Sequence, residues 1–508
     1  MQELQSSLTK VTQYLDPLLP LANAHTVDFI VEQLWTKKLP PDILQEAEGV
    51  GISEVIDQLW CLLANETESC SDSCKLFDFV REAGEYVIEE LNGVYYVNDL
   101  MNILLDSSSA NLKELVEVTE YMSIKKLHEV HIMSHVVACL AEACKSSVVV
   151  DIGSGKGYLS SMLALNHNLR ILGIDNKPTN IDGAIRTTKM LEKKWRMYEK
   201  KSFLKGKYSE TEKKFGKTFE KSRDDGTLLN QNVESSTKPT VLGVSYKHHV
   251  ESVSSQTDIR GILSEAYPDE EHSILFIGLH TCGNLSPNSL RLFVNSDLKR
   301  KSIINVGCCY HLIDEEFTSA PEWHLRRLMQ RNTERMDDPG FPMSDFLRRQ
   351  KFSLGRDARM CGTQKPLKVF KEQELNKATK PLFYRALLQQ LLILKCGPSN
   401  LPDAIVGRIA HKCDTFAEYA TKALKKLNVE IEITPAELDE FETNNDEDWQ
   451  RMKIFFLLKT ALSPVIETVI LLDKLLYLYE QGIETAFITR LFDPVVSPRC
   501  YAVIAIQK

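Results

Sequence analysis

Three alternating glycines follow a short apolar run that ends in Asp151. They are Gly153, Gly155 and Gly157, with Ser154 between the first two. Glycine lets the backbone turn tightly and brings N–H groups close to a ligand at a helix N-terminus. A dinucleotide-binding fingerprint places its third glycine one residue later, and a Walker phosphate loop has a longer spacing. The pattern therefore favours neither of those two nucleotide-binding loops.

A second acidic residue, Asp175, stands 22 residues after Gly153, at the end of the next apolar run. A carboxylate at this point of a βαβ unit can accept hydrogen bonds from both hydroxyls of a ribose. A G-x-G-x-G loop after a strand-ending acid is typical of methyltransferases, in which the loop holds the methionine carboxylate of S-adenosylmethionine. We therefore predict an S-adenosylmethionine site built from Asp151, the loop and Asp175. The alternative is a pair of tight turns in another kind of α/β protein.

Asp258 is a further candidate cofactor ligand, because it follows the third predicted strand. Its carboxylate could accept a hydrogen bond from the amino group of adenine. Alternatively, Thr257-Asp258 caps the helix that follows, since Asp is a preferred N-cap residue. The sequence weighs these two roles equally.

Two other predicted strands end in side chains that could do chemistry. His280 and Cys282 follow one strand, and Cys308, Cys309 and His311 follow the other. In an open parallel sheet, ligands bind outside the carboxyl ends of the strands. A histidine there could act as a general base. The cysteines could bind zinc or could fill the strand ends as small apolar side chains.

We favour a base or substrate-contact role for His280 and His311, and Cys282 is a third catalytic candidate. No metal is predicted, because Cys282 lacks a C-x-x-C partner. Cys308 and Cys309 are also awkward ligands for a single ion because they are adjacent. If strand alternation continues past residue 307, Cys309 and His311 lean one way and Cys308 the other. Methyl transfer needs mainly alignment and desolvation, so the absence of a catalytic triad does not exclude it.

The elements around these residues predict a parallel sheet. Apolar strands are expected at 147–151, 170–175, 274–279 and 302–307, with another at 241–245 or 247–253. Strand, glycine loop, helix and strand within roughly 30 residues form a βαβ unit. The predicted fold class is therefore α/β, with a Rossmann-like class I methyltransferase sheet.

Helical sequence flanks this core along the chain. We predict a helical N-terminal region at 1–120, the methyltransferase core at 121–314, a large helical insertion at 315–482 and the last two strands within 483–508. Residues 192–240 interrupt the core, and Glu192–Arg223 holds twelve Lys and Arg against five Asp and Glu. Such sequence buries little apolar surface, so we predict a helix extension that runs into a disordered basic insert.

Composition sets the outer limits. The 508 residues are 43% hydrophobic and 26% charged, with a net charge of −9, so RNA binding would need a local basic patch. The twelve cysteines show no disulfide framework, and the first residues lack the pattern of a signal peptide. We therefore expect reduced cysteines in a cytoplasmic or nuclear protein. No uninterrupted apolar run reaches about 18 residues, so no membrane span is expected.

Lys126, His128 and Glu129 begin a predicted helix ahead of the first strand. Composition alone predicts that they form a solvated helix face.

Several stretches together resemble the methyltransferase-like protein 25 family. The most specific read Asp-Ile-Gly-Ser-Gly-Lys-Gly-Tyr at 151–158, His-Thr-Cys-Gly at 280–283 and Cys-Cys-Tyr-His at 308–311. The resemblance extends to 122–130, 23–29, 340–343 and 492–504, and covers nearly the whole chain apart from the lysine-rich insert. It implies a methyltransferase of cytosolic or nuclear location. It also implies that Lys126, His128 and Glu129 pack beside the cofactor loop.

The strand ends at 280–283 and 308–311 are more distantly similar to those of tRNA 2′-O-methyltransferases that act on the acceptor stem. A sister family carries an rRNA adenine dimethylase label, but the Asn/Asp-Pro-Pro-Tyr/Phe motif of base N-methylases is absent here. Adenine N6 chemistry is therefore not expected. RNA is the leading substrate, contacted through the basic insert. A protein substrate is the alternative, and a non-catalytic scaffold that retains a cofactor pocket is the third hypothesis.

Overall fold

The computed structural model describes residues 1–64, 75–91, 94–106, 116, 118, 121–214, 245–268, 272–317, 339–364, 372–397 and 406–507. The chain divides into two units. Unit 1 comprises Met1–Val97, His280–Val294 and Asn305–Ile506, and unit 2 comprises Asn98–Leu279, Asn295–Ile304 and Gln507–Lys508. The boundary crosses two strands, β5 (Ile274–Cys282) and β6 (Lys301–Cys308), each of which begins in unit 2 and ends in unit 1.

Unit 2 contains the predicted parallel sheet. Its strands follow the order β6-β5-β2-β3-β4, with β2 at Val148–Ile152, β3 at Ile171–Asp175 and β4 at Tyr246–Val250. The strand β2 pairs in parallel with both β3 and β5, so Asp151 lies opposite Gly173 on one side and Ile277 on the other. Every residue of β2 and β3 is buried, as expected for central strands of a parallel sheet. The predicted Rossmann-like fold class is confirmed.

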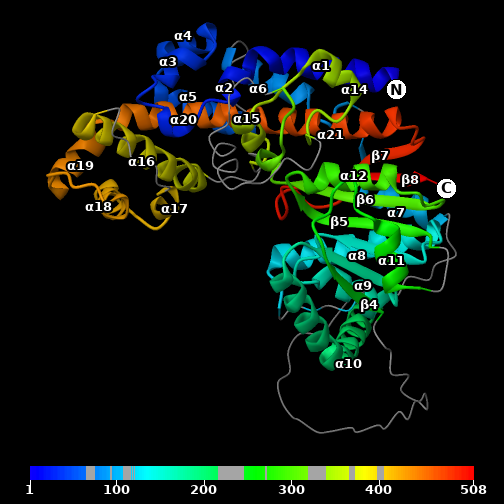
Figure 1. The fold of residues 1–508 in the computed structure, drawn as a ribbon. Helices are drawn as coiled ribbons and strands as arrows, with labels where there is room; N and C mark the ends of the chain where they lie inside the picture. Colours follow the sequence, from blue (N-terminus) through cyan, green and yellow to red (C-terminus); the bar gives the residue numbers. More distant parts are fainter. Residues whose placement is uncertain are drawn as a thin grey trace, which may run out of the picture. The chain divides into compact units, whose positions relative to one another are not determined.

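The sequence allows the third strand at 241–245 or at 247–253. The strand β4 covers Tyr246–Val250 and so overlaps the second of these ranges. The helices of unit 2 are α7 (Val97–Asp106), α8 (Ile124–Ala143), α9 (Tyr158–His167), α10 (Pro178–Lys214) and α11 (Ile259–Ala266). The long helix α10 extends well past the sheet of unit 2 (Figure 1). It forms the predicted helix extension and covers 192–214 of the basic insert predicted to be disordered at 192–240, so disorder is wrong for that part, whereas 215–240 lies outside the described residues.

Unit 1 contains the strands β1, β7 and β8. The last two strands, β7 (Thr485–Arg490) and β8 (Tyr501–Gln507), pair antiparallel within the predicted 483–508 segment. A short strand, β1 (Val94–Tyr96), pairs in parallel with β7 and was missed by the sequence argument. Three residues are too few for a periodic signal to separate a strand from its helical surroundings.

Helices make up most of unit 1. From the N-terminal region come α1 (Gln2–Leu15), α2 (Leu19–Ala22), α3 (Leu34–Lys38), α4 (Pro41–Val50), α5 (Ile52–Ala64) and α6 (Lys75–Glu85). The helix α12 (Leu285–Asn295) follows β5. The predicted insertion supplies α14 (Asp345–Gln350), α15 (Arg356–Cys361), α16 (Glu372–Cys396), α17 (Gly407–Ala410), α18 (Phe416–Leu427), α19 (Pro435–Asn444), α20 (Asp446–Ala461) and α21 (Ser463–Glu480).

The N-terminal region and the insertion share one core, although the sequence suggested separate regions. Figure 1 shows α1 alongside α21. Asn23 donates from Nδ2 to the Leu354 carbonyl over 2.6 Å, and its Oδ1 accepts from the Ala358 amide over 3.0 Å. The Phe29 ring packs edge-on against Phe455 at 5.3 Å between centroids. These contacts explain why both helical segments belong to unit 1.

The segment Asp446–Glu480 is long and apolar enough to cross a membrane by length and composition alone, with a mean hydropathy of 1.8 in its most apolar window. However, 94% of that window is buried inside the protein. Burial of this kind is typical of the core helices of a globular domain.

Candidate functional site

The glycine loop of unit 2 adopts a conformation that only glycine supports easily. Gly153, Gly155 and Gly157 have positive φ angles of 75°, 56° and 68°. A side chain in this left-handed region is strained, so the alternating glycines follow directly from the backbone path. Gly157 is also the N-cap of α9, and the loop therefore leads its backbone into a helix N-terminus.

Asp175 fixes the position of this loop. Its Oδ2 accepts a hydrogen bond from the Gly155 amide over 3.0 Å. Its Oδ1 accepts from the Lys177 amide over 2.9 Å and from Asn180 Nδ2 over 3.0 Å. Only 8% of Asp175 is exposed. The carboxylate is held in one orientation at the end of β3, beside the loop.

The loop leaves open space at its centre. A Cβ added to Gly155 would meet only the Gly153 carbonyl, at 3.9 Å, whereas a Cβ on Gly157 would lie 2.8 Å from Tyr246 Oη and from Ala184 Cβ. Two of the glycines therefore have different functions. Position 157 requires glycine because Tyr246 and Ala184 pack closely against it. Gly155 borders a space that a ligand can enter.

Asp151 is buried at the base of the loop, with 3% of its surface exposed, and Ser160 donates a hydrogen bond to its Oδ2. Burial raises the pKa of the Asp151 carboxyl to about 6, the Ser160 hydrogen bond opposes this rise, and the negative charge of Asp175 adds to it. Asp151 is thus a loop support that can carry a proton near neutral pH.

Tyr246 is a site residue that the sequence argument missed. It begins β4, is 8% exposed, and its ring lies against Gly173 of β3, 2.9 Å from a Cβ added there. The Tyr246 and Ser154 hydroxyls are both buried and lie together over Gly173, 2.8 Å and 3.0 Å from a Cβ added there, so they face one another. Only the burial of one aromatic ring against two glycines shows this role, and no sequence motif marks it.

The segment ahead of the first strand packs beside the loop, as the family resemblance implies and composition alone does not. Ser123 caps α8 by accepting from the Lys126 amide over 3.3 Å. The Lys126 ammonium lies 4.1 Å from the ring centroid of Tyr158, the residue after the last loop glycine. Burial and the nearby Lys156 charge lower the pKa of Lys126. Glu129 is 3% exposed and lies 3.6 Å from Lys125, whereas His128 is half-buried.

Asp258 has the structural role of the two that its sequence allowed. Its Oδ1 accepts a hydrogen bond from the Gly261 amide over 2.9 Å, and this contact caps α11. A role toward adenine stays a prediction.

The strand ends of unit 1 hold the candidate catalytic residues. His280 is half-buried and Cys282 is exposed, both on β5, and His311 lies in a short 3₁₀ helix at Tyr310–Leu312. His280 and Cys309 have positive φ angles of 66° and 50°. Left-handed backbone in non-glycine residues is uncommon and is often found at functional sites.

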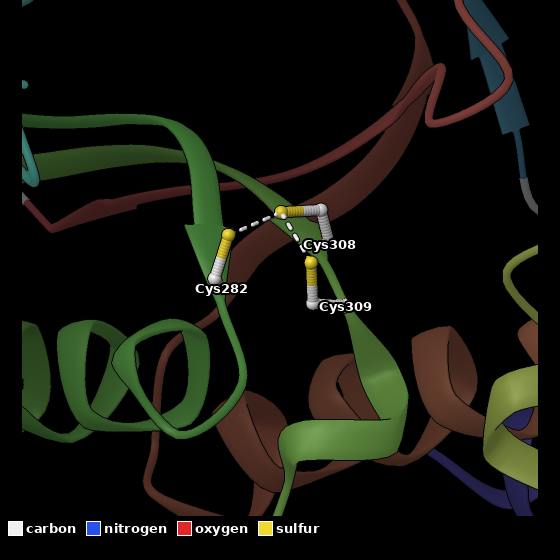
Figure 2. Close-up of side chains that lie close together, drawn as sticks. All are labelled: Cys282, Cys308 and Cys309. Atoms are coloured by element: carbon white, nitrogen blue, oxygen red, sulfur yellow. Dashed lines mark hydrogen bonds between the residues drawn. The ribbon is translucent and has the colours of Figure 1, made fainter. Parts of the chain in front are cut away.

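The expected alternation of side chains past residue 307 is wrong. The strand β6 ends at Cys308, and the left-handed turn at Cys309 replaces the pleat. As a result, the sulfur atoms of Cys308 and Cys309 are 3.8 Å apart on the same side, and Cys282 Sγ is 2.8 Å from Cys308 Sγ (Figure 2). The hydrogen bond between the Cys282 and Cys308 thiols lowers the pKa of Cys282 and raises that of Cys308.

A buried ion pair holds the turn after β6. Arg359 is fully buried, lies 3.2 Å from the buried Glu315 carboxylate and donates to the Tyr310 carbonyl over 3.0 Å. Burial lowers the pKa of His311, and the charges of Arg356 and Arg359 lower it further. These effects favour the neutral form of His311, which a general base requires.

Comparison with known proteins places this chain among methyltransferases. A methyltransferase domain model matches residues 125–316. The chain is 31% identical to the human protein called probable methyltransferase-like protein 25 over 605 aligned positions, which cover 99% of this chain and 97% of the relative. The mouse protein of the same name is also 31% identical, with the same coverage of both chains.

The chain belongs to the methyltransferase-like protein 25 family. No solved structure matches it. The matched methyltransferase domain contains the glycine loop, Asp175 and both strand ends. The family membership shows a methyltransferase domain and does not identify the methyl donor or the substrate.

Proposed function

We propose that this family member uses S-adenosylmethionine as methyl donor and binds it at the glycine loop of unit 2. The hydrogen bond from Gly155 to Asp175, in a loop of three left-handed glycines, carries the proposal. The donor supplies a methyl group on a positively charged sulfonium. The residues present fit such a ligand, because a Cβ on Gly155 would meet only the Gly153 carbonyl and the loop ends at the N-terminus of α9.

The roles within this site follow from chemistry and position. Backbone N–H groups of the loop suit the carboxylate of a methionine group. A carboxylate oxygen can accept two hydrogen bonds. Because Oδ1 of Asp175 already accepts two, Oδ2 has room for one ribose hydroxyl beside the Gly155 amide. Lys126 borders the loop from α8, and His128 and Glu129 follow it on the same helix as proposed donor contacts. Asp258 has a second carboxylate oxygen for an adenine amino group.

RNA is the proposed substrate, and exposed basic side chains on α10 support this choice. Arg186, Lys189, Lys193, Arg196 and Lys200 are all exposed and recur every three or four residues, so they form one stripe along the helix. We call this set the α10 basic stripe. Such a row of cations can neutralise successive phosphates of a nucleic acid.

The stripe starts close to the loop. Ala184 of α10 lies 2.8 Å from a Cβ built on Gly157, and Gly183 lies close to the Lys156 side chain. Arg186 follows within one helical turn. Each residue of a helix advances by about 100°, so Arg186 lies on the side of α10 opposite Ala184, and a phosphate backbone bound along the stripe would lie on the outer side of α10.

The deciding experiment supplies tritiated S-adenosylmethionine and the full chain to a cell extract lacking the endogenous protein. Half of the product is treated with RNase and half with protease. Loss of acid-insoluble label with RNase alone supports the RNA proposal. Loss with protease alone supports the protein alternative, and no label above a Gly155→Arg control supports a non-catalytic scaffold. A cytoplasmic or nuclear location is proposed because the twelve cysteines show no disulfide framework. Cell fractionation tests it.

A further inference from the structure

Three cysteine thiols from two strand ends converge in unit 1 (Figure 2). Cys282 lies at the end of β5, Cys308 at the end of β6 and Cys309 in the turn after it, and their sulfur atoms all lie within 4.8 Å of one another. Among the described residues, this is the group of three or more His, Cys, Asp or Glu side chains that could share one metal ion. Clusters of this composition have the chemistry of a soft-metal site.

The separation of the Cys308 and Cys309 sulfur atoms fits the size of a zinc ion. Two thiolates on a tetrahedral zinc, with bonds of about 2.3 Å, lie roughly 3.8 Å apart. Cys308 Sγ and Cys309 Sγ are already 3.8 Å apart. The 2.8 Å between Cys282 and Cys308 would have to lengthen by about 1 Å. Cys282 is the exposed member of the cluster and has room to make this shift.

The fold removes one of the two reasons for expecting no metal here, the adjacency of Cys308 and Cys309. Adjacent cysteines on a regular strand point to opposite faces and cannot share an ion easily. The left-handed φ of 50° at Cys309 turns its side chain to the same side as Cys308. That conformation costs energy in a non-glycine residue, and the buried Arg359, bonded to the Tyr310 carbonyl, maintains it from the next turn.

Buried cations offset the charge that such a site would carry. Three thiolates around one divalent ion have a net charge of −1. Lys474 is 2% exposed, donates to Ser286 Oγ over 2.7 Å, and interacts electrostatically with Cys308. Arg499 is 8% exposed and interacts with Cys309, while it also pairs with Glu467 at 2.9 Å. Neighbouring charges of this kind stabilise metal-bound thiolates.

We propose that Cys282, Cys308 and Cys309 bind one Zn²⁺ through three thiolates, with the fourth coordination position open beside the exposed Cys282. Binding releases the thiol protons to solvent, and no oxidation is involved. Three protein ligands and one open position are typical of zinc sites that bind a water or a substrate atom. The proposal concerns unit 1 alone and does not depend on the donor proposed for unit 2.

The test measures zinc directly on the full-length chain, purified with a reductant, stripped with a chelator, reloaded with zinc chloride and desalted. Mass spectrometric metal analysis should give one equivalent for the wild type. Cys282→Ser and Cys309→Ser should retain less than a tenth of that amount. Cys413→Ser is the matched control, because Cys413 is a partly exposed thiol of unit 1 outside the cluster, and it should retain one equivalent. Cobalt should give thiolate charge-transfer absorption only in the wild type and this control.

Three results would overturn the proposal. The first is no retained zinc in wild-type protein whose three thiols all react with a thiol reagent. The second is retention of one equivalent of zinc by both Cys282→Ser and Cys309→Ser, as in the wild type. The third is a Cys282–Cys308 disulfide in protein prepared without reductant, with no zinc uptake after its reduction. Circular dichroism melting of each variant separates loss of the metal from loss of the fold, and Cys282→Ser tests the site at an exposed position.

Discussion

The Gly155 amide donates a hydrogen bond to Asp175 Oδ2 over 3.0 Å and so joins the glycine loop to the end of the neighbouring strand. The other oxygen of the same carboxylate is held by Lys177 and Asn180. A loop fixed in this way does not have to be ordered when a ligand binds, and the saved entropy favours affinity. Gly155 and Asp175, both predicted from sequence spacing, therefore together fix the position of the loop.

Gly173 and Tyr246 should show a strong steric coupling. A Cβ on Gly173 would lie 2.8 Å from Tyr246 Oη and 2.9 Å from its ring, and overpacking of this kind costs about 1–3 kcal/mol. We expect Gly173→Ala to lower the free energy of unfolding by that amount, and Tyr246→Val to restore part of it in the double variant. Chemical denaturation of the four proteins measures the coupling. Additive effects of the two substitutions would contradict the contact.

The glycine loop and Tyr246 differ in how far the sequence predicts them. The spacing of Asp151, three glycines and Asp175 predicted the loop because each position has a local backbone reason. Tyr246 could not be found in this way, since its role depends on β4 packing beside β3, more than 70 residues apart in the chain. The sequence also does not predict the turn at Cys309, because β6 ends at Cys308 although the local pattern continues to indicate a strand.

Asp151 should make stability depend on pH. Its pKa in the folded protein is about 6, above its ordinary value of about 4, so its stabilising contribution is full below about pH 4 and is lost as the pH rises through 6. Asp151→Asn cannot titrate. The unfolding free energy of the variant should therefore rise relative to wild type between pH 4 and 7, by up to roughly 3 kcal/mol.

Denaturation at several pH values measures this difference, and Asp182→Asn, at an exposed carboxylate on α10, is the control. A difference that falls with rising pH would show that the Asp151 pKa is lowered in the folded state.

The α10 basic stripe should contribute to RNA affinity through electrostatics. Replacing Lys193, Arg196 and Lys200 by Gln should weaken binding to a labelled tRNA pool and reduce the slope of log affinity against log salt by about two to three. Glu192→Gln/Glu199→Gln is the matched control on the same turns and should not weaken binding. An unchanged salt slope in the triple variant would exclude the stripe as the RNA contact.

At least one of His280 and His311 should matter for turnover. If either accepts a proton from the methylated group, its alanine variant should reduce kcat by roughly 10²–10⁴-fold with unchanged donor affinity. Single-turnover methylation of the substrate identified with the labelled donor gives the rates. Near-normal kcat in both variants would remove the base and leave positioning as the main source of catalysis.

The central claim is that the glycine loop binds S-adenosylmethionine, and isothermal titration calorimetry of the full-length chain with this ligand and with S-adenosylhomocysteine tests it most directly. We expect saturable one-to-one binding by the wild type. Gly155→Arg, which fills the open space, should abolish binding, Asp175→Ala should weaken it at least tenfold, and Asp182→Asn should leave it unchanged. Wild-type protein that is folded and yet binds neither ligand would contradict the account.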